Sequence, residues 1–187
     1  ELIAQASKQE LKFTRRRTEM PSPRLAALFD KLVQRLSGFG LEPFDVDADG
    51  NCQFSALAHQ LFADAAHHAA VRQTVCGQLC EFADRYRDFV EGYEAFVDAL
   101  TRIEWGNHVT LHAAADAYNA RIILVTTYDD EWKIQIDPTG TAHNGETPTT
   151  VWLGLIDEWH YVSVVPMSSN DESTVALPRG DVAKRKR

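Results

Sequence analysis

Apolar side chains recur at three- and four-residue spacing through the first two thirds of the chain, and this period predicts helices. The first helix begins at Arg24 and ends at Ser37-Gly38, because Gly38 is a natural C-cap. Four further helices are predicted: 52–62, a segment with Val71, Val75 and Leu79 on one face, 93–100, and the stretch after Trp105-Gly106-Asn107.

The period changes in the last third of the chain. Residues 121–127 form a continuous apolar, β-branched run typical of a buried strand, and residues 132–136 alternate as a half-exposed strand does. Two more strands, 151–156 and 160–165, are separated only by Asp157-Glu158-Trp159, which predicts a hairpin. We therefore expect an α+β fold in which N-terminal helices pack on a small, mostly antiparallel sheet.

Both ends differ from this body in composition. Residues 1–23 are polar and predict an arm or linker, residues 24–166 form the domain, and residues 167–187 predict a disordered basic tail ending in KRKR. Residues 41–166 contain 20 acidic and 6 basic side chains, a balance of −14. This acidic body makes nucleic acid an unlikely partner and favours a partner with a positive face, although it also fits a merely solvated surface.

No apolar run reaches the roughly 20 residues of a membrane span, and no signal-peptide pattern is present. Three cysteines offer no even-numbered disulfide framework, which fits a reducing compartment. We therefore expect a protein without membrane segments, cut from a longer chain, that is cytoplasmic, with the KRKR end drawing it weakly toward the nucleus.

No metal site is predicted. Cys76 and Cys80 lie four apart on a helix and are expected to be half-buried packing residues. The His67-His68 pair lacks a third ligand, and the segment HVTLH at residues 108–112 lacks the glutamate of a zinc-protease motif.

One stretch carries candidate chemistry. An acidic turn, residues 47–51, leads into a helix whose first residue is Cys52, with Asn51 as its expected N-cap. A helix N-terminus favours the thiolate form of a cysteine, and Gly50 lets successive N–H groups of the turn point at one place. Such a turn could serve as an oxyanion hole. The alternative is a cysteine that acts only as a small apolar residue.

A catalytic cysteine needs a base, and His160 is the best-placed histidine. It opens a strand directly after a tight turn and lies between Trp159 and Tyr161, so its ring is held by aromatic neighbours. Paired with Cys52, it would form the thiolate–imidazolium couple of cysteine hydrolases.

Three blocks in the same order resemble the OTU (ovarian tumour) cysteine proteases: DADGNCQFSALAHQLF, EWGNHVTLHAAADAYNARI and VWLGLIDEWHYVSVV. The resemblance implies a papain-like fold and a deubiquitinating thiol hydrolase that needs no metal or organic cofactor. It implies ubiquitin, polyubiquitin chains or a ubiquitin-like modifier as the partner. It also implies Cys52 as nucleophile, His160 as general base and then acid, Asp49 as the active-site aspartate, and an oxyanion hole made by the backbone of Gly50, Asn51 and Cys52.

The sequence leaves two points open. Many family members have Asn or Asp two residues after the histidine, where this chain has Val162, so the group that orients His160 must be Asp49, Asp157, a backbone carbonyl or water. If none serves, the chain is a ubiquitin-binding pseudoenzyme with weak or no turnover. Trp105, Trp159 and Tyr161 either border the substrate channel or pack in the core.

Overall fold

The computed structural model describes residues 22–102, 104–139 and 146–167. Almost all of the predicted arm and tail therefore lies outside the described residues. The exceptions are Met167, whose N–H donates to the Gly40 carbonyl, and the start of the first helix, where Ser22 accepts a hydrogen bond from the Leu25 N–H and Pro23 occupies the first helical position. The first helix therefore begins at Pro23, one residue before the predicted Arg24, and Ser22 is its N-cap.

The predicted helices and strands are present, and their bounds lie within two residues of those expected. One further strand, residues 41–44, was not predicted. The helices are α2 (Pro23–Ser37), α3 (Cys52–Phe62), α4 (His68–Glu81), α5 (Tyr93–Leu100) and α6 (His108–Tyr118), with short 3₁₀ helices η1 (Ala65–His67), η2 (Ala83–Arg85) and η3 (Arg87–Phe89). The strands are β1 (Leu41–Phe44), β2 (Ala120–Thr126), β3 (Lys133–Ile136), β4 (Thr149–Ile156) and β5 (His160–Pro166).

The five strands form one sheet in the order β1-β5-β4-β2-β3. Three of the four pairings are antiparallel, which agrees with the prediction of a mostly antiparallel sheet. The exception is the pair β2 and β4, which run parallel. After the antiparallel strand β3 on one side of β2, the chain returns and β4 pairs with the other side of β2 in the same direction. The pairing of β1 with β5 brings residues 41–44 beside residues 163–166.

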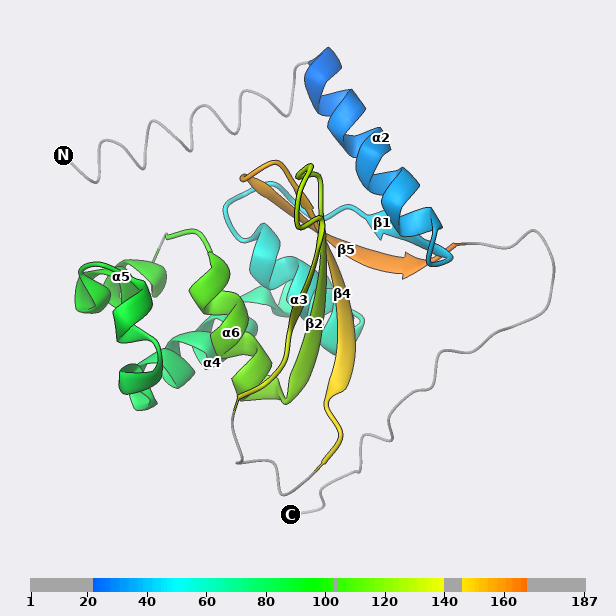
Figure 1. The fold of residues 1–187 in the computed structure, drawn as a ribbon. Helices are drawn as coiled ribbons and strands as arrows, with labels where there is room; N and C mark the ends of the chain where they lie inside the picture. The colour runs from blue at the N-terminus through cyan, green and yellow to red at the C-terminus, as the bar shows by residue number, and fades with distance from the viewer. Residues whose placement is uncertain (1–21, 103, 140–145, 168–187) are drawn as a thin grey trace.

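Helices cover both faces of the sheet (Figure 1). On one face, α2 packs through Leu32 and Leu36 on a cluster with Val125, Ile156, Val162 and Val164. Gly154 permits this approach, because a β-carbon there would lie 2.6 Å from Val162 and 2.8 Å from Leu32. The exposed Phe29 and Val33 show that the buried stripe of α2 is narrower than its apolar pattern suggests.

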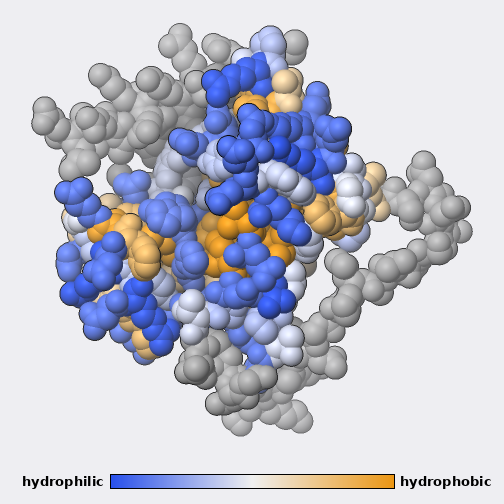
Figure 2. Space-filling model, in the orientation of Figure 1, coloured by the Kyte–Doolittle hydropathy of each residue, from blue (hydrophilic) through white to orange (hydrophobic). Residues whose placement is uncertain are grey.

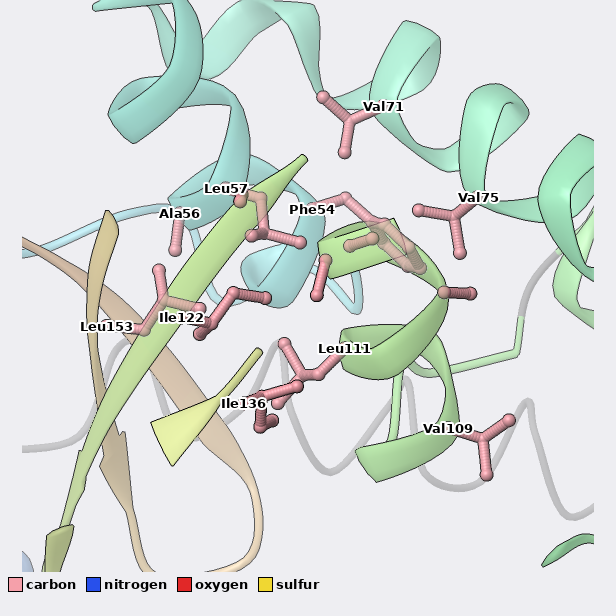
Figure 3. Close-up of a cluster of buried hydrophobic side chains, with 14 of the residues drawn as sticks. Phe54, Ala56, Leu57, Val71, Val75, Val109, Leu111, Ile122, Ile136 and Leu153 are labelled. Atoms are coloured by element: carbon pink, nitrogen blue, oxygen red, sulfur yellow. The ribbon is translucent and has the colours of Figure 1, made fainter. Parts of the chain in front are cut away.

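The larger core lies on the other face, where α3 and α6 pack on the sheet and α4 packs on these two helices (Figure 3). Phe54 and Leu57 of α3, Val71 and Val75 of α4, and Leu111 of α6 are almost completely buried there. Burying side chains of this size stabilises the fold by about 1.5–3 kcal/mol each. The first turn of α3 is therefore held rigidly, and this rigidity extends to the residue that begins it.

Figure 2 shows a mostly hydrophilic face with apolar residues gathered near its centre, where helices meet the sheet.

The cysteines differ from the prediction at one position. Cys52, Cys76 and Cys80 are all free thiols, and Cys76 of the predicted packing pair is buried. Cys80, in the last turn of α4, is exposed, so its prediction was wrong. Among the helices that the structure describes, each is too short or too polar to cross a lipid bilayer.

Candidate active site

Cys52 is the first residue of α3 and is 5% exposed. The turn before it requires glycine at position 50, where φ is +88° and an added β-carbon would lie 3.2 Å from Trp105 Nε1. The indole of Trp105 therefore lies close to the backbone of the turn that precedes Cys52.

Asn51 occupies the N-cap position of α3, but its side chain makes no capping hydrogen bond, contrary to expectation. Its amide group is used elsewhere: Nδ2 donates to Asp49 at 3.2 Å, and Oδ1 accepts from Arg72 at 2.8 Å. Asp49 also accepts the Asn51 backbone N–H at 2.9 Å. Asp49 thus closes the turn on itself, and of the predicted oxyanion donors the Asn51 N–H is already engaged.

Arg72 of α4 supports this turn from the protein interior. The residue is 9% exposed, and its guanidinium lies over the Phe54 ring at 4.1 Å. The guanidinium donates to Asn51 and to the carbonyl oxygens of Leu100, Glu104 and Gly50. Burial lowers the pKa of Arg72, opposed by nearby groups that include Cys76 and Asp49. A single buried cation thereby joins the nucleophile turn to the segment that leads into α6.

His160 is the first residue of strand β5. The hairpin between β4 and β5 pairs Ile156 with His160, and Asp157 adopts a φ of +53° to close it. The Trp159 ring stacks on the imidazole with centroids 5.1 Å apart. The ring of His160 is thus held by the turn and by an aromatic neighbour, as the sequence suggested.

The carboxylate of Asp45 also holds the His160 ring in place. Its Nε2 lies 2.8 Å from Oδ1 of Asp45, whose side chain is 74% exposed while that of His160 is 6% exposed. Burial lowers the pKa of His160, but the hydrogen bond to Asp45 and the influence of the nearby Cys52 outweigh it, so the pKa rises to about 9. The imidazole is therefore protonated at neutral pH and within the influence of the Cys52 thiol.

None of the acceptors expected for His160 is the one found. Asp49 is bonded to Asn51, and Asp157 pairs with Arg24 at 3.1 Å. Asp45 takes this place because β1 pairs with β5 up to Phe44 and Ser163, which brings the next residue of the chain beside His160.

The start of α6 is attached to the same centre through Gln53. The Gln53 side chain is buried, accepts a hydrogen bond from Thr110 Oγ1 at 2.6 Å and donates to the Asn107 carbonyl at 3.1 Å. Gly106 must lack a side chain, because a β-carbon there would lie 2.0 Å from Gln53 Oε1. Burial raises the pKa of Tyr161 to about 12, although the hydrogen bond from Gln53 acts in the opposite direction.

The tertiary structure therefore brings together most of the predicted residues: Cys52 with His160, Gly50 with Trp105, and Trp159 with His160. Sequence reasoning missed Asp45, Arg72 and Gln53. Arg72 did carry a signal, since it is the only Lys or Arg between residues 41 and 84. Within the described ranges, no group of three or more His, Cys, Asp or Glu side chains could hold a metal ion.

Such an arrangement suits covalent catalysis by a thiol. A buried, protonated imidazole beside a cysteine at a helix N-terminus stabilises a thiolate, and the turn amides lie at the same helix end. The geometry fits acyl transfer, in which a thiolate attacks a carbonyl carbon and the imidazolium supplies a proton to the leaving group.

Comparisons with known proteins agree with this geometry. A family profile described as OTU-like cysteine protease matches residues 47–161. The Arabidopsis thaliana protein named OVARIAN TUMOR DOMAIN-containing deubiquitinating enzyme 11 is 39% identical over 171 residues, which cover 90% of this chain and 65% of that protein. The chain thus spans less than two thirds of the length of this relative.

Solved structures share the fold. The OTUD1 OTU domain superposes with a TM-score of 0.63 at 22% identity, over 75% of this chain and 98% of that one. The Hazara virus OTU bound to ubiquitin superposes with a TM-score of 0.51 at 14% identity, over 69% of this chain and 83% of that one. The predicted papain-like, OTU-type α+β fold is confirmed.

Proposed function

Because this chain belongs to the OTU-like cysteine protease family, we propose that it is a deubiquitinating thiol hydrolase that cleaves the peptide or isopeptide bond after the C-terminal glycine of ubiquitin. The observation that carries the proposal is the pairing of Cys52, at the N-terminus of α3, with a buried His160 whose pKa is raised to about 9. A protonated imidazole beside the thiol is the resting state that a cysteine hydrolase requires.

In the first half of the reaction, the Cys52 thiolate attacks the carbonyl carbon of the terminal glycine and forms a tetrahedral intermediate. Its oxyanion accepts hydrogen bonds from the N–H groups of Gly50 and Cys52, each worth about 3–4 kcal/mol in the transition state. Asp49 holds the Asn51 N–H and so keeps the turn in shape. The intermediate collapses as the carbon–nitrogen bond breaks and His160 transfers its proton to the leaving amine.

In the second half, the neutral His160 accepts a proton from water, and the resulting hydroxide equivalent attacks the thioester. Collapse of this second intermediate breaks the carbon–sulfur bond and restores the thiolate and the imidazolium. Ubiquitin leaves as a carboxylic acid, which loses its proton to bulk water. No cofactor takes part in these steps.

The choice of ubiquitin as substrate has separate support. The plant relative is named a deubiquitinating enzyme, and a viral OTU of the same fold is described bound to ubiquitin. The balance of −14 over residues 41–166 suits a partner with a positive face. Because this attraction acts between exposed charges, affinity should fall as salt rises.

We assign substrate contact to Trp105 and Trp159, which are partly exposed and lie against the nucleophile turn and the His160 ring. Tyr161 is also partly exposed, but its hydroxyl bonds to Gln53 and its ring packs on the main core. Its contribution to substrate binding is therefore indirect, through the placement of Gln53. The free thiols of Cys76 and Cys80 support a reducing compartment such as the cytoplasm.

The test is incubation with ubiquitin that carries a C-terminal electrophile, followed by mass spectrometry. We expect one adduct on the unmodified chain, none on Cys52→Ala, and slowed formation on His160→Ala; Cys76→Ala is the matched control and should react like the unmodified chain. Ubiquitin binding without any adduct would contradict the hydrolase and support the pseudoenzyme.

A further inference from the structure

We propose that Asp45 is the positioning residue for His160, and that in this chain the loop directly after β1 supplies the acceptor that β5 lacks. The proposal rests on the proposed function, since positioning matters only if His160 exchanges a proton with Cys52. It concerns a residue that the sequence did not single out, seven positions before the nucleophile.

The strand β5 cannot orient the ring itself. Residue 162 points to the same face of the strand as residue 160, and here it is a valine packed against Leu32 and Val164 in the cluster beneath α2. A valine side chain has no hydrogen-bonding atom. An acceptor for the imidazole must therefore come from another element.

The pairing of β1 with β5 provides that element. The last paired residues are Phe44 and Ser163, so Asp45 follows along one strand and Val162 follows along the other. The two positions are next to each other at the point where the strands leave their common ladder. A carboxylate at position 45 is therefore as close to His160 as a side chain at position 162 would be, and the 2.8 Å contact realises this.

The hydrogen bond fixes the roles of both ring nitrogens. A carboxylate accepts, so Nε2 carries a proton and donates it to Asp45. Nδ1 is buried and has no hydrogen-bond partner among the described residues, while the thiol of Cys52 is near enough to raise the pKa of His160 along with Asp45. Nδ1 is thus the nitrogen that exchanges a proton with the sulfur.

The alternatives in the same region are committed elsewhere. Both oxygens of Asp49 bind Asn51, and Asp157 pairs with Arg24 on the far side of the hairpin. The groups that act on the charge of His160 are Asp45 from the loop after β1 and Cys52 from α3. Asp49 shapes the turn, whereas Asp45 holds the ring.

The first test measures the ring directly and needs no ubiquitin. The titration of His160 is followed by NMR of the imidazole protons, assigned by comparison with His160→Gln, in the unmodified chain and in Asp45→Asn, Asp49→Asn and Asp88→Asn. Removing the partner charge should lower the His160 midpoint by about one to two pH units in Asp45→Asn. Asp49→Asn should shift it by less than about half a unit, and Asp88→Asn, which removes an exposed carboxylate on η3, should leave it unchanged.

The second test measures reactivity. Alkylation of Cys52 by iodoacetamide across the pH range reports the thiolate–imidazolium pair, and Asp45→Asn should lower the pH at which the imidazolium is lost.

The third test measures turnover. With a fluorogenic ubiquitin substrate, Asp45→Asn should lower kcat by about 10- to 100-fold and leave KM nearly unchanged. This loss is smaller than the roughly 10⁴ seen when a serine triad loses its aspartate. Asp45→Glu should recover part of the rate, and Val162→Asn should raise the rate of Asp45→Ala more than that of the unmodified chain.

An unchanged midpoint in Asp45→Asn, or an equal shift in Asp49→Asn, would overturn the proposal. These outcomes are distinct from failure of the proposed function. A shifted midpoint in Asp45→Asn together with no ubiquitin adduct would leave Asp45 as the positioning residue and remove ubiquitin as the substrate.

Discussion

Arg72 and Asn51 join the interior of the protein to its nucleophile turn, because a guanidinium nitrogen of Arg72 donates to the Asn51 side chain at 2.8 Å. Arg72 lies on α4, 20 residues after Cys52 in the sequence. Another arm of the same guanidinium donates to the carbonyls of Leu100 and Glu104. Three segments that are distant in sequence therefore share one buried cation, and the position of the nucleophile depends on it.

Replacing Arg72 with methionine keeps much of the volume but removes every one of these donors. We expect the free energy of unfolding to fall by about 2–4 kcal/mol, because buried carbonyl oxygens lose charged partners. Arg72→Lys should recover less than half of this loss, since one ammonium cannot span both segments. Urea denaturation measures the stability, and a lysine variant as stable as the original would contradict the bridging role.

Gly106→Ala should damage the site through Gln53. The new methyl group would lie 2.0 Å from Gln53 Oε1, a side chain that is buried and bonded on both sides. We expect a loss of about 1–3 kcal/mol in stability and slower alkylation of Cys52, the residue next to Gln53. The matched control is Gly77→Ala on α4, where nothing lies within 4 Å; it should gain about 0.5–1 kcal/mol.

Stability should depend on pH through His160. Its pKa is about 9 in the folded protein and near 6.5 when unfolded, so the contribution of the charged ring is fully present below pH 6.5 and is lost as the pH rises through 9. The difference in unfolding free energy between the unmodified chain and His160→Gln should shrink by on the order of 2–3 kcal/mol between about pH 6 and pH 10. A difference that stays constant across this range would show that the ring is not held as a cation.

Tyr86→Phe should weaken the attachment of α6. The Tyr86 hydroxyl donates to the buried Asp116 at 2.6 Å, and burial together with this carboxylate raises the pKa of Tyr86 to about 12. Removing the hydroxyl leaves a buried carboxylate short of one donor and should cost about 1.5–3 kcal/mol in thermal or urea unfolding. Tyr118→Phe, which keeps the edge contact with Phe62, is the control and should change stability by less than about 0.5 kcal/mol.

Much of the site could be predicted from local pattern. The start of α3 at Cys52 follows from an acidic, glycine-containing turn and the apolar period behind it, and the hairpin that presents His160 follows from two strands three residues apart. In both cases the deciding interactions lie within a few residues of each other. The exposure of Cys80 shows the limit of such reasoning, because helical spacing does not reveal where a helix extends past its core.

The sequence by itself determined which residues can do chemistry and which local structures present them: a thiol at a helix N-terminus, a histidine at the start of a strand, and a valine where an acceptor could have stood. Only the tertiary structure decided which carboxylate holds the histidine and which cation holds the turn. Asp45 reaches His160 through the pairing of β1 with β5, and Arg72 reaches Asn51 through the packing of α4 on α3. Such contacts depend on strand register and helix packing, which are set by burial across the whole domain and leave no periodic trace near the residues that they join.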